Sequence, residues 1–198
     1  MRPPGVSRTS ENLDMANEQF GPLAGLIGTW EGDQGLDVSF SYKAGKVIET
    51  PYREKATFNI VGDVDNGDQK LWVLDYTTAA IRIGEDDVFH TELGYWLWDA
   101  DRQEVMRCFM VPRGSTILAG GNSTADATSF QMTAQQGNPA FGVLSNPYLI
   151  ERAQCTEYTL STTVEGDTWS YEEDTVMTIK ATGGVLHHTD KNTLQRVK

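Results

Sequence analysis

Apolar and polar residues alternate along most of the chain after residue 50, and this alternation is the main structural signal in the sequence. A period of two places successive side chains on opposite faces of an extended segment, so it predicts strands with one buried face. The segment 168–179 shows this period over its whole length, with Trp169, Tyr171 and Met177 on one face. Similar runs cover 52–60, 70–78 (continuing towards 83), 89–98, 104–111, 115–119, 129–134 and 151–164.

Turn residues separate these runs. Asn66-Gly67 and Glu165-Gly166-Asp167 are typical of tight hairpin turns, and Pro112 ends the run before it. Eight to ten strands joined in this way, with one or two short helices such as a turn near Pro22, predict an all-β fold. We expect an antiparallel, up-and-down β-barrel of about ten strands, because closure removes the edges of so large a sheet. Such a barrel is either filled by side chains or encloses one small ligand.

Other stretches lack the alternation. The segment 36–51 is expected to be a loop with at most one weak strand, and 137–147 a loop rich in Gly, Asn and Pro. The glycines of 28–35 suggest a strand that bends sharply or lets another backbone approach closely. The polar residues 1–18 contain Pro and Gly, so we expect them to be a disordered leader, and 19–198 to form a single barrel domain.

Charge and cysteine content restrict the expected partners and compartment. The chain has 28 acidic and 16 basic residues, a formal net charge of −12. Nucleic acids and anionic membrane surfaces attract clustered Lys and Arg, so neither is an expected partner. No run of about 20 apolar residues is present, and the N-terminal sequence lacks the apolar core of a signal peptide. Cys108 and Cys155 give no disulfide framework, and we expect inert core thiols in a cytoplasmic protein.

Several enzyme classes lack their sequence motifs. The chain contains no GxGxxG or GxxxxGK[ST] for nucleotides, no CxxC or HExxH for zinc, and no GxSxG around a serine nucleophile. Glu172-Glu173-Asp174 is a run of carboxylates within a predicted strand. Alternation sends its members to both faces, so we interpret them as solvated charges and not as paired catalytic acids.

The three histidines are the remaining candidates for chemistry. His187 and His188 are adjacent near the C-terminus, so on an extended segment only one of them can face a cavity. Taken alone, the segment 183–198 favours a solvated polar tail. His90 shares a strand face with Glu92 and two tryptophans, which indicates either a polar cavity or a hydrogen-bonded pair at the surface, with little to choose between them.

Three segments together resemble the nitrobindin family of haem-binding, ten-stranded β-barrels. Gly28-Thr-Trp-Glu-Gly-Asp-Gln-Gly35 is similar to the family signature GxWxGxG, with one extra residue before its last glycine. Phe89-His-Thr-Glu-Leu-Gly-Tyr95 resembles the family's strand in which a histidine precedes Glu-x-Gly-aromatic. The segment 186–194 lies where the family places its proximal histidine. The resemblance extends over about residues 20–198, with longer segments at 36–51 and 135–147 and with Pro112-Arg-Gly114 in place of small polar residues.

The resemblance implies a haem b cofactor and a set of site residues. His188 would be the axial ligand of the iron, with His187 as the rival assignment, and His90 would be the catalytic residue on the ligand-facing side. The other implied cofactor-binding residues are Thr29, Trp30, Phe89, Met177 and, as a looser match towards a haem propionate, Arg152.

The function implied is that of a haem protein whose open axial position binds nitric oxide, or whose ferric form isomerises peroxynitrite to nitrate. Its partners would be these small molecules. The alternative is a haem-free carrier, similar to lipocalins or fatty-acid-binding proteins, that takes a small apolar ligand. A filled barrel that serves as an interaction module is a third reading. The sequence leaves a homodimer open.

Overall fold

The computed structural model describes residues 17–197 as two short helices and eleven strands. The helices are η1 (Glu18–Leu26) and α2 (Pro147–Arg152). The strands are β1 (Gly28–Ser41), β2 (Lys46–Asp65), β3 (Lys70–Arg82), β4 (Val88–Asp99), β5 (Glu104–Val111), β6 (Ser115–Asn122), β7 (Ser129–Gln135), β8 (Val143–Ser145), β9 (Ala153–Glu165), β10 (Thr168–Ile179) and β11 (Gly184–Arg196). Neither helix is long and apolar enough to cross a membrane.

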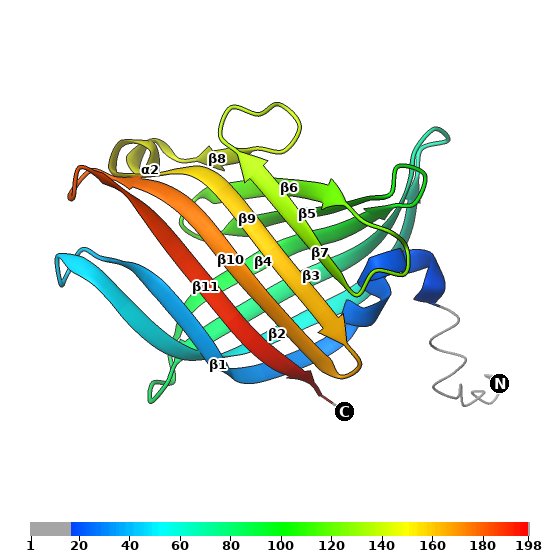
Figure 1. Ribbon diagram of the computed structural model, residues 1–198, viewed down its shortest axis with the longest axis horizontal. Helices are drawn as coiled ribbons and strands as arrows, with labels where there is room; N and C mark the ends of the chain where they lie inside the picture. Colours follow the sequence, from blue (N-terminus) through cyan, green and yellow to red (C-terminus); the bar gives the residue numbers. More distant parts are fainter. Residues whose placement is uncertain (1–16, 198) are drawn as a thin grey trace, which may run out of the picture.

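Ten of the strands form a closed antiparallel barrel (Figure 1). The order around the sheet is β5-β4-β3-β2-β1-β11-β10-β9-β7-β6, and pairing of β5 with β6 closes the ring. The extra strand, β8, pairs with β6 outside the ring. Most neighbours in the ring are also neighbours in sequence, as the turn-separated strand runs predict. The expected antiparallel barrel of about ten strands with one or two short helices is confirmed.

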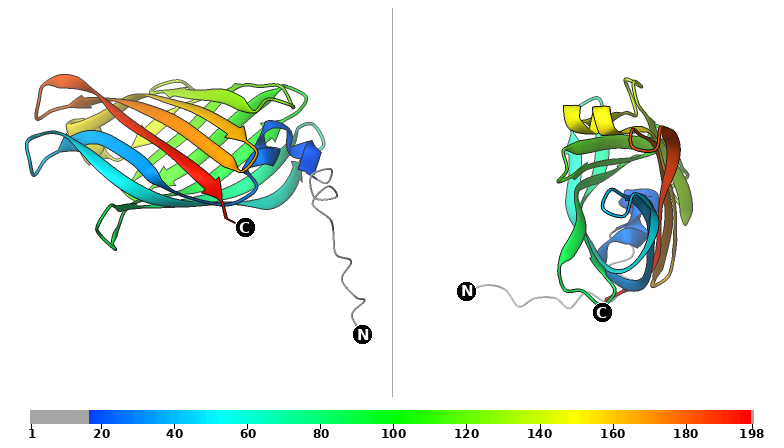
Figure 2. Two further views of the ribbon diagram at one scale, coloured as in Figure 1. Left: turned by 60° about the horizontal axis from the view of Figure 1, so that its bottom comes forward. Right: turned by 90° about the vertical axis from the view of Figure 1, so that its left-hand side faces the viewer.

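Helix η1 fills one end of the barrel, and Figure 2 shows it at the end opposite the β1–β2 and β10–β11 hairpin tips. Phe20, Leu23 and Leu26 of η1 are fully buried. Trp30 at the start of β1 donates a hydrogen bond from Nε1 to the carbonyl oxygen of Leu26 at 2.7 Å, and its ring packs edge-on against Trp169. This apolar plug leaves the other end of the barrel as the place for a ligand.

Gly32 and Gly35 of β1 allow the strand to bend and allow neighbouring groups to pack closely against it. The register of β1 against β2 shifts between Gly32 and Gly35, which marks a β-bulge. A Cβ atom on Gly32 would lie 2.5 Å from the carbonyl oxygen of Thr193, and one on Gly35 would lie 2.4 Å from the ring of Tyr52. The sharp bend and the close approach expected for the signature segment are therefore both present.

The structure corrects several predicted boundaries. The expected loop 36–51 belongs to the long hairpin of β1 and β2, and the expected loop 137–147 contains the short strand β8. The first residues of the run 151–164 belong to α2, because Asn146 caps this helix by accepting a hydrogen bond from the Leu149 amide at 3.1 Å. The C-terminal segment is no solvated tail, since β11 pairs with both β1 and β10. Of the expected leader, residues 1–16 lie outside the described part of the chain.

Candidate functional site

A cavity of about 500 Å³ opens at the barrel end opposite η1. This volume lies within the range of small-molecule sites in proteins. Its walls are largely apolar and aromatic, whereas its floor carries carboxylates and His90. The apolar lining includes Phe40, Phe89, Phe109, Val111, Met177 and Leu186. Arg82 and Arg113 also line the cavity, so it combines apolar walls with cationic groups.

His188 lies on the wall of this cavity, and His187 does not. Both residues belong to β11, where alternation places them on opposite faces of the barrel wall. The ring of His187 is exposed and forms a contact of 2.7 Å between Nδ1 and Oδ2 of Asp174. The structure thus brings one of the two adjacent histidines to the cavity, as the alternation requires.

Asp37 of β1 holds the His188 ring in place. Nε2 of His188 lies 2.6 Å from Oδ2 of Asp37, whose other oxygen accepts a hydrogen bond from Ser39 at 2.7 Å. Burial by itself raises the pKa of Asp37, but the hydrogen bond and charge of His188 outweigh burial and hold this pKa below its usual value. Asp37 is therefore an ionised acceptor at neutral pH. The contact leaves the second ring nitrogen of His188 as a donor atom for a metal.

His90 reaches the cavity from a strand nearly across the barrel. It belongs to β4, which is four strands away from β11 in the ring of ten. Nε2 of His90 lies 3.2 Å from Oε1 of Glu92, the next inward-facing residue. Burial lowers the pKa of His90, but the hydrogen bond and the charge of Glu92 raise it above its usual value. His90 thus faces a polar cavity, the first of the two alternatives offered by the sequence, and its pair with Glu92 lies inside the barrel and not at the surface.

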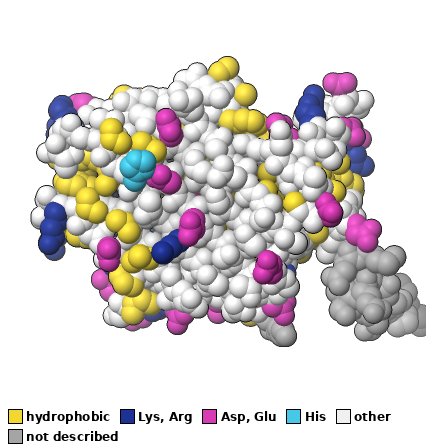
Figure 3. All heavy atoms as spheres, viewed as in Figure 1, with side chains coloured by type: hydrophobic (Ala, Val, Ile, Leu, Met, Phe, Trp, Pro, Cys, Tyr) yellow, Lys and Arg dark blue, Asp and Glu magenta, His cyan; other side chains and the backbone are white. Residues whose placement is uncertain are grey.

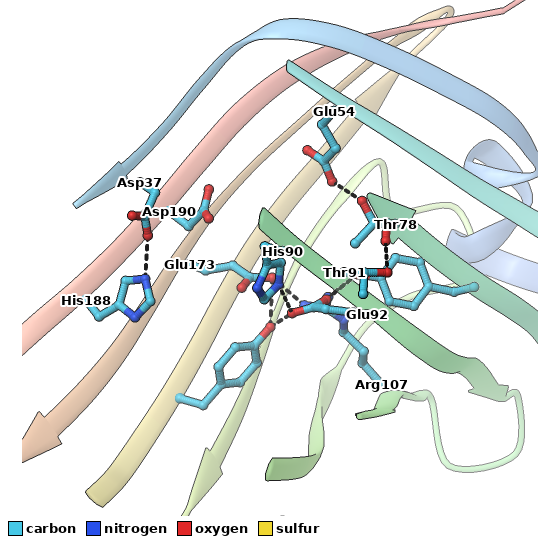
Figure 4. A network of polar contacts seen from close by, with 12 residues as sticks. Asp37, Glu54, Thr78, His90, Thr91, Glu92, Arg107, Glu173, His188 and Asp190 are labelled. Atoms are coloured by element: carbon cyan, nitrogen blue, oxygen red, sulfur yellow. Dashed lines mark hydrogen bonds and ion pairs between the residues drawn. The ribbon is translucent and has the colours of Figure 1, made fainter. Parts of the chain in front are cut away.

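Arg107 of β5 binds two carboxylates beneath the cavity floor (Figure 4). Its guanidinium donates to Glu92 and Glu173, and to the hydroxyl groups of Tyr76 and Tyr158. Burial raises the pKa of Glu92, but the charge of Arg107 and the hydrogen bond from His90 prevail and lower it to about 2. The side chains of Arg107 and Glu92 are only 3% and 8% exposed. The arginine is thus neutralised by buried partners and is not free to bind a ligand.

A second group of acidic residues continues the network across the barrel. Glu54 accepts hydrogen bonds from Thr78 at 2.5 Å, Tyr171 at 2.7 Å and Asn192 at 2.8 Å. Burial, with the nearby charge of Glu173, raises the pKa of Asp190 to about 8, so this carboxyl is mainly protonated at neutral pH. A void of about 30 Å³ separates the two groups and is large enough to hold water. Its lining shares His90, Glu92, Glu173 and Asp190 with the cavity above.

The other predicted site residues divide into two sets. Phe89 and Met177 line the cavity. Thr29 and Trp30 lie at the η1 end of β1 and are not among the residues that line it. Arg152 ends α2 with its side chain half exposed and paired with Glu151. It does not line the cavity.

Sequence reasoning missed Asp37, Arg107 and Glu173. The expectation that Glu173 is a solvated charge is wrong, because its side chain is only 15% exposed and pairs with Arg107 inside the barrel. Asp37 fell in the expected loop 36–51. The sequence does hold a signal for Glu173. It lies two and four residues from Tyr171 and Met177, so on strand β10 its side chain shares their face of the sheet.

Cys155 is buried as expected, whereas Cys108 is only half-buried.

The donor set of the cavity fits haem. One imidazole backed by a carboxylate is a common arrangement for a metal-bound histidine, and a single protein ligand is enough for haem iron. Apolar and aromatic walls suit the macrocycle, and Arg82 and Arg113 suit its carboxylates. Residues 17–197 contain no group of three or more His, Cys, Asp or Glu side chains that would hold a bare metal ion.

Comparison with known proteins identifies the family. The sequence profile of the THAP4-like, heme-binding beta-barrel domain matches residues 19–196, so the chain belongs to this family. The resemblance to haem-binding barrels is thereby confirmed. Eleven chains of known structure match. One is the crystal structure of Rv2717c from M. tuberculosis, with a TM-score of 0.62, 19% identity and coverage of 89% of this chain and 95% of that one. It shows a similar fold. No curated protein sequence matches.

Proposed function

We propose that this barrel binds haem b in the cavity, with His188 as the axial ligand of the iron. The observation that carries the proposal is the pair of His188 and Asp37, which places an oriented imidazole on the wall of an apolar cavity. A carboxylate acceptor fixes the tautomer of a metal-bound imidazole and raises its basicity. Arg82 and Arg113 are the candidates for the propionates. Haem bound there would supply an iron that can take a small ligand.

His90 is proposed to act on that small ligand. It lies nearly across the barrel from His188, and Glu92 favours its protonated form. A protonated imidazole donates a hydrogen bond to a bound anion such as peroxynitrite and offers less to neutral nitric oxide. We therefore propose nitric oxide binding together with isomerisation of peroxynitrite to nitrate, and we assign to His90 the role of holding the anion while its atoms rearrange.

The alternative, a haem-free carrier of an apolar ligand, has weaker support. A fatty acid that enters the barrel carboxylate-first needs a free cation at the cavity floor. Beneath this cavity Arg107 is already paired with Glu92 and Glu173. Haem would also use the His188–Asp37 pair on the cavity wall as an iron ligand, whereas a purely apolar ligand makes no use of this imidazole.

A hemin titration followed by absorbance tests the proposal. We expect a saturable Soret band with the wild-type protein and with His187→Ala, and loss or strong weakening of that band with His188→Ala. His187 is the matched control because it is the adjacent residue on the opposite face. Equal titrations of His187→Ala and His188→Ala would refute His188 as the ligand, and no specific band in the wild type would refute haem binding.

Peroxynitrite decay measured by stopped flow tests the role of His90. On the haem-loaded protein, His90→Ala should slow isomerisation while nitric oxide affinity stays nearly unchanged. Unchanged isomerisation in this variant would mean that His90 does not hold the anion.

A further inference from the structure

One flank of the open barrel end carries a charge opposite to that of the whole chain. Three segments form this flank: 42–47 at the tip of the β1–β2 hairpin, helix α2, and 180–185 at the tip of the β10–β11 hairpin. Together they contain four exposed cations and one carboxylate, Glu151. The cations are Lys43, Lys46, Arg152 and Lys180. This surface, called here the mouth flank, is net positive in a chain whose net charge is −12.

Hydrogen bonds join the three segments into one surface. The Tyr42 hydroxyl donates to the carbonyl oxygen of Arg152 at 3.0 Å, and the Lys180 amide donates to the same oxygen at 3.0 Å. Nζ of Lys180 also lies 2.8 Å from Oε1 of Glu151. Because Arg152 links both hairpin tips through its carbonyl oxygen, the cations are displayed together.

The same segments expose large apolar side chains. Tyr42 is 53% exposed, Tyr148 57% and Val185 69%, and Val47 and Ile150 are also exposed. In Figure 3 hydrophobic side chains gather at the left-hand end, where these hairpins lie, with Lys or Arg side chains at its edge and Asp or Glu side chains further in. Apolar and tyrosine side chains interspersed with cations are typical of protein surfaces that contact the interface of a bilayer.

We propose that the mouth flank docks on a lipid bilayer that contains anionic lipids. The cations attract the headgroups, and each Lys or Arg near such a surface strengthens binding by about fivefold. The exposed apolar side chains at the hairpin tips and on α2 then enter the headgroup region. The net charge of the whole chain argues against an anionic membrane as a partner. On the mouth flank, however, cations outnumber carboxylates, so this one surface can be attracted to anionic headgroups.

The opposite side of the opening determines the orientation of docking. The loop between β3 and β4 contains Glu85, Asp86 and Asp87, with Arg82 already paired with Glu85. This acidic loop is repelled by anionic headgroups and would point away from them. This difference in charge would turn the mouth flank, and not the β3–β4 loop, towards the bilayer.

Docking would bring the entrance of the cavity against the membrane. Tyr42 of the β1–β2 tip and Leu149 of α2 both line the cavity. An amphipathic ligand such as haem partitions into bilayers, so the docked barrel would exchange it with the membrane directly. This consequence rests on the proposed function, whereas docking itself does not.

Vesicle flotation with the full-length protein, without haem, tests the docking. The probes are phosphatidylcholine vesicles with and without phosphatidylserine. We expect binding that requires phosphatidylserine, weakens with salt and falls by about 25-fold in Lys43→Gln/Lys46→Gln, because two lysines are removed. The matched control, Lys55→Gln/Lys191→Gln, removes the same charge from the barrel wall and should bind as the wild type does.

Three results would overturn the proposal: no binding to either vesicle, binding that ignores phosphatidylserine, or an equal loss in the control variant. A second pair, Tyr148→Ser and Ile150→Ser, tests the apolar contribution and should weaken binding without removing its salt dependence. A hemin titration of the same proteins separates the two proposals. A Soret band without vesicle binding refutes docking alone, and vesicle binding without a Soret band refutes haem binding alone.

Discussion

Replacement of Arg107 by Met should destabilise the barrel strongly, because it leaves Glu92 and Glu173 buried without their cation. Breaking a buried ion pair from one side costs about 3–5 kcal/mol. The pKa of Glu92 points in the same direction, because burial raises it and the charge of Arg107 is the largest influence that lowers it, to about 2. We therefore expect a loss of about 3 kcal/mol or more.

The cost should depend on pH in a defined direction. In the wild type, the lowered pKa of Glu92 gives stability that is present above pH 4.5 and is lost as the pH falls towards about 2. In Arg107→Met the buried carboxylates lack a cation, so their pKa values rise and the folded state binds protons. The variant should therefore be relatively more stable at pH 5 than at pH 7, whereas the wild type should not gain stability over that interval from this group.

Urea unfolding followed by tryptophan fluorescence measures the effect, since the chain has five tryptophans. The triple variant Glu92→Gln/Arg107→Met/Glu173→Gln removes all three charges and should recover most of the lost stability. Lys55→Met is the control, because its ion pair with Glu31 is exposed and should contribute less than about 1 kcal/mol. If Arg107→Met cost no more than Lys55→Met, or if the triple variant were no more stable than the single one, the reasoning would be refuted.

Other predictions concern the cavity. Asp37→Asn should weaken hemin binding by about 10- to 100-fold and raise the haem reduction potential, because the His188 imidazole loses its anionic acceptor. A hemin titration measures the affinity, and spectroelectrochemical titration measures the potential. An unchanged potential would contradict the role assigned to Asp37. The Cys155 thiol lines the cavity, and burial raises its pKa to about 11. At neutral pH it should therefore react slowly with a thiol reagent, and more slowly still when hemin is bound. If hemin protected Cys108 instead, hemin would bind elsewhere. Gly35→Ala should destabilise the fold by about 1–3 kcal/mol in thermal unfolding, since its Cβ would overlap the Tyr52 ring, and a wild-type melting temperature would contradict the close packing.

The barrel itself could be predicted because most strands alternate apolar and polar residues and are joined by short turns. Residues 168–179 are an example, and β10 has these bounds. The part of the β1–β2 hairpin at residues 36–51 could not be found in this way. It contains Pro51 and small polar residues, and its pairing partner β11 lies far away in sequence. Its strand character comes from pairing and not from a local pattern.

The polar floor explains the errors at the site. In an ordinary barrel an inward-facing residue is apolar, so charged residues are assigned to the outside. Here Asp37, Glu173 and Asp190 face inward, where Arg107, His188 and tyrosine hydroxyls supply their partners. The binary pattern therefore fails at the residues that give the cavity its chemistry. The prediction that only one of His187 and His188 faces the cavity is confirmed, because it depends on strand geometry and not on hydrophobicity.

The most direct test of the central claim is rescue of His188→Gly by imidazole. This variant opens space where the ring of His188 lies, so added imidazole can occupy the ligand position. We predict that His188→Gly with hemin gives a weak or altered Soret band and that imidazole restores the wild-type spectrum in a saturable way, while His187→Gly needs no imidazole. A His188→Gly spectrum identical to that of the wild type before imidazole is added would contradict the account.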